Sequence, residues 1–264
     1  INLGGGTVAQ KNTNDIIEVC GKIAKILLEN GAETTRVEST VEYIGRAAGI
    51  QLKCHATMTA IFVNVKNAAG SLTHLEKPRV SSFNLQKVDE INTLSREFSS
   101  HKIEFDQLQS RVEAIDHQVI DFSWPQKILS AGLVSVAPML LFKASWKDLL
   151  FAFFIGILGY LASQLAGRHS ATPFLGAITG GLVISLIATR FKIVGIADSS
   201  SNIVISALMP LVPGVPLTNS LREIIDRDII SGLVRGMDAL MIAGAIGIGA
   251  IVGTFLANLL MGVL

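Results

Sequence analysis

The second half of the chain contains a series of hydrophobic stretches, and these constrain the fold more than any other feature. A transmembrane helix needs about 20 predominantly apolar residues to cross a bilayer. We predict five spans, at residues 128–142, 149–166, 174–189, 202–217 and 239–261. Half of all residues are hydrophobic and 16% are charged, against about a quarter charged in a typical soluble domain. The chain is therefore predicted to be an α-helical polytopic membrane protein.

The fourth predicted span is interrupted by prolines. Pro210, Pro213 and Pro216 lack a backbone N–H, and Gly214 tolerates unusual dihedral angles, so a continuous helix is not expected here. Within a bilayer, free backbone polar groups are tolerated only where protein covers them or water reaches them. A proline-broken span therefore indicates a cavity or a substrate path.

The segment after the break, residues 217–238, combines charged residues with the apolar period of a helix. Asp228, Ser231 and Arg235 are spaced to share one helix face. Arg222 and Asp226 have the i, i+4 spacing of an ion pair. The alternative is a solvated helix beside the membrane, since surface ion pairs are common and weak. Our candidate substrate and ion path consists of Pro213, Gly214, Asn219, Arg222, Asp226, Asp228, Ser231, Arg235 and Asp238.

Small residues and one acid mark the remaining spans. Gly176 and Gly180, like Gly249 and Gly253, are four residues apart, an interval that allows close helix contact but is common in glycine-rich chains. Asp238 stands where the fifth span begins. An ionisable group at that depth indicates function by default, and the alternative is a paired charge at the membrane interface.

The first part of the chain is charge-rich. Residues 1–120 hold 13 of the 22 Lys+Arg and 14 of the 21 Asp+Glu. This shift in composition predicts a flexible tail at residues 1–14, a soluble cytoplasmic α+β domain at 15–122 and a transmembrane domain of about five helices at 125–264. The opening INLGGGTVAQKNTN lacks the basic and apolar regions of a signal peptide, so we do not expect one here. Whether this end is native or truncated stays open.

Periodicity predicts the order helix, helix, strand, strand, helix, helix for the soluble part. The predicted ranges are 15–30, 35–48, 52–63, 71–75, 85–98 and 105–119, with a turn at 67–70. Gly31 and Gly49 are stop signals for the first two helices. Thr35 and Glu38 have capping-box spacing at the start of the second helix. Even positions from Leu52 onward are apolar, which predicts one half-buried strand.

Several classes of function are not indicated. Cys20 and Cys54, the two cysteines, form no disulfide framework or CxxC motif, which favours a reducing, cytoplasmic location. Cys54 and His55 are neighbours on a strand and point to opposite faces, so they cannot form a nucleophile and base pair. No ligand spacing indicates a metal or cofactor, and a net charge of +1 without a basic face does not indicate nucleic acid. We expect no enzyme.

Five spans place the two chain ends on opposite sides of the membrane. With the first domain in the cytoplasm, the inner loops would hold Arg168, His169, Arg222, Arg227 and Arg235, and the outer loops Lys143, Lys147, Arg190 and Lys192. This small bias favours a cytoplasmic N-terminal domain.

Two stretches resemble the bacterial threonine/serine exporter family, specifically its YjjP-like part. LLENGAETTRVESTVEYIGRAAGI is similar to the opening helices of that family. VPGVPLTNSLREIIDRDIISGLVRGMDAL is similar to its PG followed by an Asn, an acidic-basic helix and SG-x-x-R. The family commonly has Arg-Asp where this chain has Arg222-Glu223, so the acid here has a longer side chain.

The resemblance implies a secondary transporter, an antiporter of the bacterial cytoplasmic (inner) membrane that exports L-threonine and L-serine and is driven by the proton motive force. A related two-gene system is associated with succinate, so a dicarboxylate exporter subunit is an alternative. A membrane-anchored regulatory or assembly protein is an alternative of another class. Family members often join this five-span unit to a second one, which implies a second membrane subunit or self-association. Arg222 or Arg235 would pair with a substrate carboxylate, and Asp228 or Asp238 with an ammonium group or a proton.

Overall fold

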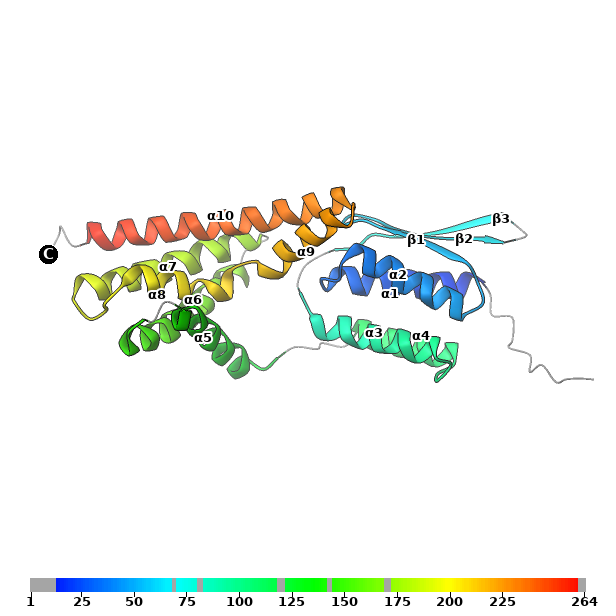
Figure 1. Cartoon of the computed structure of the whole chain (residues 1–264), viewed down its shortest axis with the longest axis horizontal. Helices are drawn as coiled ribbons and strands as arrows, with labels where there is room; N and C mark the ends of the chain where they lie inside the picture. The colour runs from blue at the N-terminus through cyan, green and yellow to red at the C-terminus, as the bar shows by residue number, and fades with distance from the viewer. Residues whose placement is uncertain are drawn as a thin grey trace, which may run out of the picture. The chain divides into compact units, whose positions relative to one another are not determined.

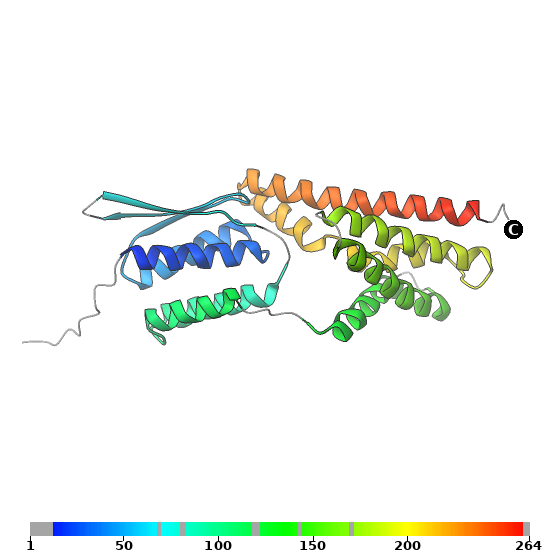
Figure 2. The ribbon, with the colours of Figure 1, turned by 180° about the vertical axis from the view of Figure 1, so that it is seen from behind.

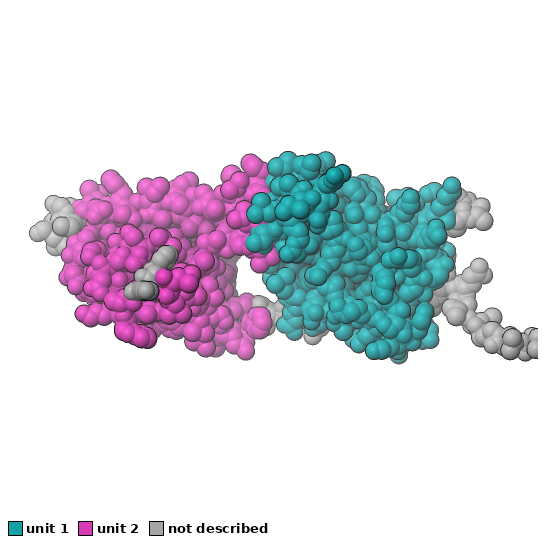
Figure 3. Space-filling view, viewed as in Figure 1, with its two compact units in different colours: residues 1–120, 218–235 teal, residues 121–217, 236–264 magenta. Residues whose placement is uncertain are grey.

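The computed structural model describes residues 13–67, 70–79, 83–117, 122–141, 144–168 and 172–260. It divides into two compact units, coloured separately in Figure 3. Unit 1 contains residues 1–120 and 218–235, and unit 2 contains residues 121–217 and 236–264. Each unit is therefore discontinuous in sequence.

Unit 1 is built in three layers (Figures 1 and 2). Helices α1 and α2 cover one face of an antiparallel sheet with the order β1-β2-β3, and α3 and α4 pack on the other side of that helix pair. Gly31 and Gly49 end the first two helices with φ of 97° and 77°, as their stop signals predicted. The elements are α1 (Thr13–Glu29), α2 (Thr34–Ala47), β1 (Leu52–Ala56), β2 (Ile61–Asn67), β3 (Gly70–Glu76), α3 (Leu85–Ser99) and α4 (Phe105–His117).

Large aliphatic side chains fill the space between these layers. Ile23 and Leu27 of α1, Val63 of β2, Leu94 of α3 and Leu108 of α4 are each at most 1% exposed. They recur at helix or strand spacing, so each element presents one apolar face to a shared core. Burying that area is the main term that stabilises the unit in water.

The predicted single strand at residues 52–63 is wrong, because a tight turn divides it. Thr57 and Ala60 close a two-residue loop, with Thr57 N donating to Ala60 O at 2.8 Å. The hairpin moves the inward face from even to odd positions, so Ile61 is buried and Phe62 is 42% exposed. The apolar alternation continues through the turn and therefore does not reveal it. Of the predicted turn at 67–70, residues 68 and 69 lie outside the described residues.

The predicted capping box of α2 is also wrong. The residue before the helix is Glu33, which makes no side-chain cap, and the helix begins at Thr34. Glu38 instead accepts a hydrogen bond from Ala56 N at 2.8 Å, across to the first strand. The Glu38 carboxylate therefore bonds to β1 and not to the N-terminus of its own helix.

Unit 2 contains the apolar helices. They are α5 (Trp124–Leu141), α6 (Trp146–Arg168), α7 (Pro173–Ile193), α8 (Ser200–Ala207) and the 3-10 turn η1 (Met209–Leu211), while α9 (Gly214–Ile225) and α10 (Ile229–Leu259) supply residues to both units. Within the described ranges, α6, α7 and α10 are long and apolar enough to cross a membrane. The segment from α8 to η1 forms one further candidate span with α9, bent by 69°. The predicted first span lies in α5, which begins with polar residues and is not in this set, so five spans remain a prediction.

Glycines bring three of these helices into backbone contact. A Cβ added at Gly249 of α10 would lie 2.1 Å from Ile178 O of α7, and one at Gly253 would lie 2.3 Å from Leu182 O. The predicted close contact is therefore confirmed for this glycine pair. Gly176 packs similarly against α6, since its Cβ would lie 2.8 Å from the Ser163 carbonyl oxygen.

Candidate functional site

The break in the fourth predicted span lies between η1 and α9. Val212 is extended, with φ −66° and ψ 129°, and Pro213 separates it from α9. The Val212 carbonyl accepts from Gly214 N at 2.8 Å, and the Pro213 carbonyl accepts from Leu217 N at 3.1 Å. Pro216 falls in the first turn of α9, where a missing N–H costs little. The span is thus broken as predicted, but these two carbonyls each bond to nearby main chain.

The segment predicted as one amphipathic helix consists of two helices joined by a sharp corner. At the corner Arg227 adopts a left-handed conformation with φ 69°. Its N–H donates to Ile224 O at 3.1 Å, and Asp228 N donates to Glu223 O at 2.9 Å. This is the hydrogen-bond pattern of a Schellman motif, in which glycine is the usual left-handed residue. The sequence did not predict this helix end, because the left-handed residue is an arginine and not a glycine.

A buried ion pair holds the corner to the loop between α1 and α2. Arg235 donates Nε to Glu223 Oε2 at 3.1 Å and Nη2 to Glu223 Oε1 at 2.9 Å. The same Nη2 donates to Ala32 O at 3.1 Å. Glu223 is 0% and Arg235 2% exposed. Such two-point guanidinium contacts combine strength with fixed geometry.

Three further contacts surround this pair. Thr34 Oγ1 donates a short hydrogen bond to Asp228 Oδ2, and Thr34 N donates to Glu223 Oε1 at 3.2 Å. Arg222 pairs with Glu33, and not with Asp226 as the spacing predicted. We call Glu33, Thr34, Arg222, Glu223, Asp228 and Arg235 the polar cluster; all six belong to unit 1.

Close packing of α9 on α10 fixes the geometry of the polar cluster. Ser220 Oγ donates to Gly232 O at 2.7 Å, and a Cβ on Gly232 would lie 2.9 Å from the Ser220 carbonyl oxygen. Only glycine therefore allows this approach. In the part of the chain that the structure describes, Ser231 Oγ and Arg235 Nη1 are buried without a hydrogen-bond partner. Such groups are costly to bury. Both still have a hydrogen-bond donor available beside the ion pair.

The structure brings together part of the residue set chosen from the sequence. Arg222, Asp228 and Arg235 belong to the polar cluster, and Asn219 Nδ2 donates to Gly31 O at 3.0 Å beside it. Ser231 is buried on α10 within the same unit. The other four lie elsewhere: Asp226 is exposed in the corner, Asp238 is exposed farther along α10, and Pro213 and Gly214 stand at the break in unit 2.

Sequence analysis missed Glu33, Thr34 and Glu223 as members of the site. The resemblance marks Glu223 only as a longer acid than the Asp of the Arg-Asp pair. Thr34 is 189 residues from Glu223, and no local pattern connects them. The Thr34 hydroxyl contacts both carboxylates of the corner, Glu223 and Asp228. The whole cluster contains three acidic and two basic residues.

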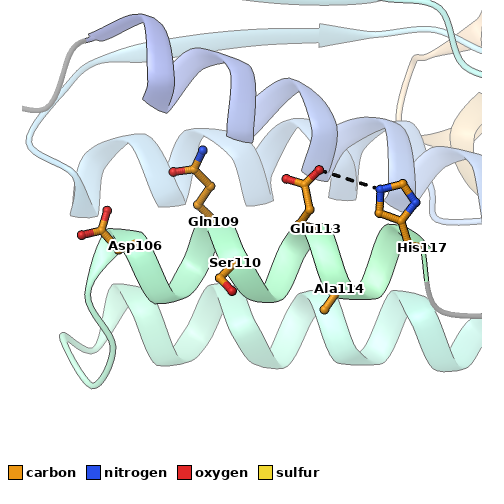
Figure 4. A pocket seen from close by; sticks show the side chains of 6 residues that line it. All are labelled: Asp106, Gln109, Ser110, Glu113, Ala114 and His117. Carbon is orange, nitrogen blue, oxygen red and sulfur yellow. Dashed lines mark ion pairs between the residues drawn. The ribbon is translucent and has the colours of Figure 1, made fainter.

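A depression on α4 is the second feature considered as a binding site. A shallow depression of about 450 Å³ lies along one face of α4, from Asp106 to His117 (Figure 4). Its Glu113 accepts a hydrogen bond from Lys22 Nζ at 2.8 Å, and this bond lowers the pKa of Glu113 below its usual value. His117 lies 3.8 Å from the same carboxylate. All lining side chains come from one helix, so nothing encloses a ligand. Elsewhere too, the described residues include no group of three or more His, Cys, Asp or Glu placed to hold a metal ion.

The apolar helices, the broken span and the polar corner define an integral membrane protein with a charge-rich unit attached. Comparison with known proteins gives the family. Residues 18–257 match the family model ThrE, described as "Putative threonine/serine exporter". The chain therefore belongs to the threonine/serine exporter family.

Individual relatives differ in how much of their length the chain covers. It is 22% identical to a probable succinate transporter subunit YjjP from Klebsiella aerogenes, over 89% of this chain and 92% of that protein. It is 20% identical to a threonine/serine exporter from Corynebacterium glutamicum and to a probable one from Mycobacterium tuberculosis, over 93% and 94% of this chain. It spans only 52% and 47% of those two proteins. These relatives are named as transporters or exporters and not as enzymes. No solved structure matches the chain.

Proposed function

We propose that this chain is a subunit of a secondary exporter of L-threonine and L-serine, driven by the proton motive force across a bacterial inner membrane, with unit 1 in the cytoplasm. The observation that carries the proposal is the polar cluster, in which residues of α9, the second half of the broken span, and of the start of α10 contact Glu33 and Thr34 at the start of α2. A zwitterion requires both signs of charge in one site, and the cluster contains both. The exporters among the relatives support this substrate class.

The proposal gives different roles to the residues of the polar cluster. Arg235 is already bonded to Glu223 and to Ala32 O, so it positions the corner. The Arg222 side chain is 62% exposed and is the guanidinium that a substrate carboxylate can reach. Asp228 is only partly buried and bonds to Thr34, so it is the acid that takes up a proton or faces an ammonium group.

A dicarboxylate such as succinate is the second candidate substrate. The specific support is coverage, because the chain matches almost the full length of the YjjP relatives and about half of the amino-acid exporters. A protein named a subunit also supports the requirement for a second membrane subunit, or for self-association, before a closed path exists. A membrane-anchored regulatory protein is the candidate of another class, and it predicts no transport at all.

Counterflow in proteoliposomes separates these candidates. Labelled serine, threonine and succinate are offered to the purified chain, with and without a second membrane subunit from the same genome. Uptake of serine or threonine supports the first proposal, and uptake of succinate alone supports the second. If no substrate moves with the second subunit present, the transporter role of this chain is contradicted.

An Asp228→Asn variant tests the coupling role. We expect exchange of substrate for substrate to continue, while net export driven by a pH gradient falls at least tenfold, because the amide cannot take up the proton. Asp89→Asn, an exposed acid on α3, is the matched control and should leave both rates unchanged. Equal rates in Asp228→Asn and wild type would remove Asp228 from the coupling path.

A further inference from the structure

A groove between α2 and α3 in unit 1 is lined by three arginines. It has a volume of about 330 Å³, and Ser95 is buried in its wall. The polar residues that matter for its chemistry are Arg36, Tyr43, Arg46, Asn92, Ser95 and Arg96. Pockets of this size are at the lower end of those that bind small molecules.

No carboxylate lines this groove. Within the described residues, Arg36 and Arg46 make no ion pair. Arg96 donates Nη2 to Thr93 Oγ1 at 2.9 Å, a neutral partner. Glu97, the residue after Arg96, pairs with Arg111 of α4. An anion long enough to contact these guanidinium groups gains attraction from each one that it reaches.

The spacing of the arginines indicates the shape of that anion. Arg36 and Arg46 are ten residues apart on α2, which is about 15 Å along a helix axis. A single small oxyanion cannot reach both, whereas an elongated anion can. Tyr43 lies between them, is 50% exposed, and has the Arg46 guanidinium 5.6 Å from its ring centre. An exposed ring with an adjacent guanidinium offers a stacking surface for a heterocyclic base.

We propose that the groove between α2 and α3 binds a nucleoside di- or triphosphate, with the base on Tyr43 and the phosphates among the arginines. Guanidinium groups match phosphate oxygens in charge and geometry. The groove lies on the same helix as Thr34 of the polar cluster, so a bound nucleotide would stiffen the helix that holds the α9–α10 corner. This site is separate from the transport site, and its binding test does not depend on the substrate.

Equilibrium binding to the full chain in neutral detergent micelles tests the proposal, with labelled ATP and GTP as probes. Inorganic triphosphate should compete, while adenosine should bind at least tenfold more weakly than ATP. Tyr43→Ala should weaken ATP but leave triphosphate unchanged. The triple variant Arg36→Gln, Arg46→Gln and Arg96→Gln should weaken both by about tenfold or more. Resistance of Cys20 and Cys54 to thiol labelling checks that each variant is folded, because both thiols are buried.

The matched control changes the same number of charges outside the groove. Lys53→Gln, Lys66→Gln and Lys102→Gln remove three exposed cations and should leave ATP affinity unchanged. Equal weakening in this control would mean non-specific attraction and would overturn the site. Absence of ATP and GTP binding at millimolar concentration would overturn it too. Binding only to vesicles containing anionic phospholipid, lost in the arginine variant, would assign the groove to a lipid surface instead.

Discussion

The interiors of the two units are filled with different side chains. Unit 1 buries many large aliphatics such as Ile23 and Leu27, whereas alanines such as Ala152 and Ala207 make up about half of the buried core of unit 2, beside Ile184 and a few other large side chains. Many large apolar residues of unit 2 are exposed, and Ile251, for example, is 71% exposed. In water, burial of apolar area drives packing. In hydrocarbon that drive is absent between helices, and close backbone contact through small residues replaces it.

Buried polar groups differ between the units as well. Unit 1 encloses an ion pair, Glu223 and Arg235, with hydrogen bonds to main chain and to Thr34. In unit 2, Asp148 is 1% exposed and accepts from Asp198 N and Ser199 N at 2.9 and 3.0 Å at the start of α8. Both acids accept main-chain N–H bonds from segments that are distant in sequence, but only Glu223 is also paired with a buried cation. Both tryptophans are in unit 2 and both cysteines in unit 1. Fluorescence and thiol labelling can therefore report on the units separately.

The largest expected effect breaks the ion pair of unit 1. Arg235→Met leaves Glu223 charged and buried without its partner, and we expect a loss of about 3–5 kcal/mol in the free energy of unfolding of unit 1. Thiol labelling of Cys20 and Cys54 against denaturant measures it. The double variant Arg235→Met and Glu223→Leu should recover most of the loss. If the double variant were as unstable as the single one, the charge would not be the cause.

The next effect tests packing through small residues in unit 2. Gly249→Ala places a methyl group against Ile178 O, so α7 and α10 must separate, at a cost of about 1–3 kcal/mol. Tryptophan fluorescence during unfolding in detergent should show the loss. Gly247→Ala on the same helix is the control, since a Cβ there meets nothing within 4 Å. Equal effects at both glycines would refute the contact.

A smaller effect concerns the two buried thiols of unit 1. Burial raises the pKa of Cys20 and of Cys54 from 9.0 to about 12. The folded state therefore holds these protons when the unfolded state has released them, and stability is complete below pH 9 and falls as the pH rises toward 12. By pH 10 the loss should be about 1 kcal/mol per thiol. Urea unfolding followed by circular dichroism at pH 8 and pH 10 measures it. A Cys20→Ala and Cys54→Ala variant should lose this part of the pH dependence.

The smallest effect is a gain in stability at the corner between α9 and α10. Arg227 holds φ 69°, a conformation that costs most residues about 1 kcal/mol. Arg227→Gly removes this strain and should stabilise unit 1 by about 0.5–1 kcal/mol, measured by thiol labelling. Asp226→Gly, beside it, should bring no gain because Asp226 does not have a positive φ. A destabilised Arg227→Gly variant would mean that the guanidinium contributes more than the strain costs.

Much of the fold follows from local patterns in the sequence. Helices α1 and α2 end where Gly31 and Gly49 predicted, and the break near Pro213 is present, because backbone restrictions act at single residues. The corner at Arg227 escaped prediction because its left-handed residue is not glycine. The two-residue turn after Thr57 escaped because it preserves the alternation of apolar residues.

The candidate site was only partly accessible from sequence. Charges after a broken span drew attention to Arg222, Asp228 and Arg235. Their partners Glu33 and Thr34 lie near the start of the chain, and such pairings depend on tertiary packing that no periodicity records. The Glu223 side chain is long enough to reach both Arg235 and Thr34 N.

Unit 1 is assembled from two separate stretches of chain, residues 1–120 and 218–235. A protease that cuts the connection before α5 would therefore nick the protein without releasing the charge-rich unit. The fragment that ends near residue 117, produced alone, would carry an open seam at the loop between α1 and α2, where Glu33 and Thr34 lose their partners. An expression strategy that aims at this unit has to supply residues 218–235 as well, for instance by a short graft that closes the gap.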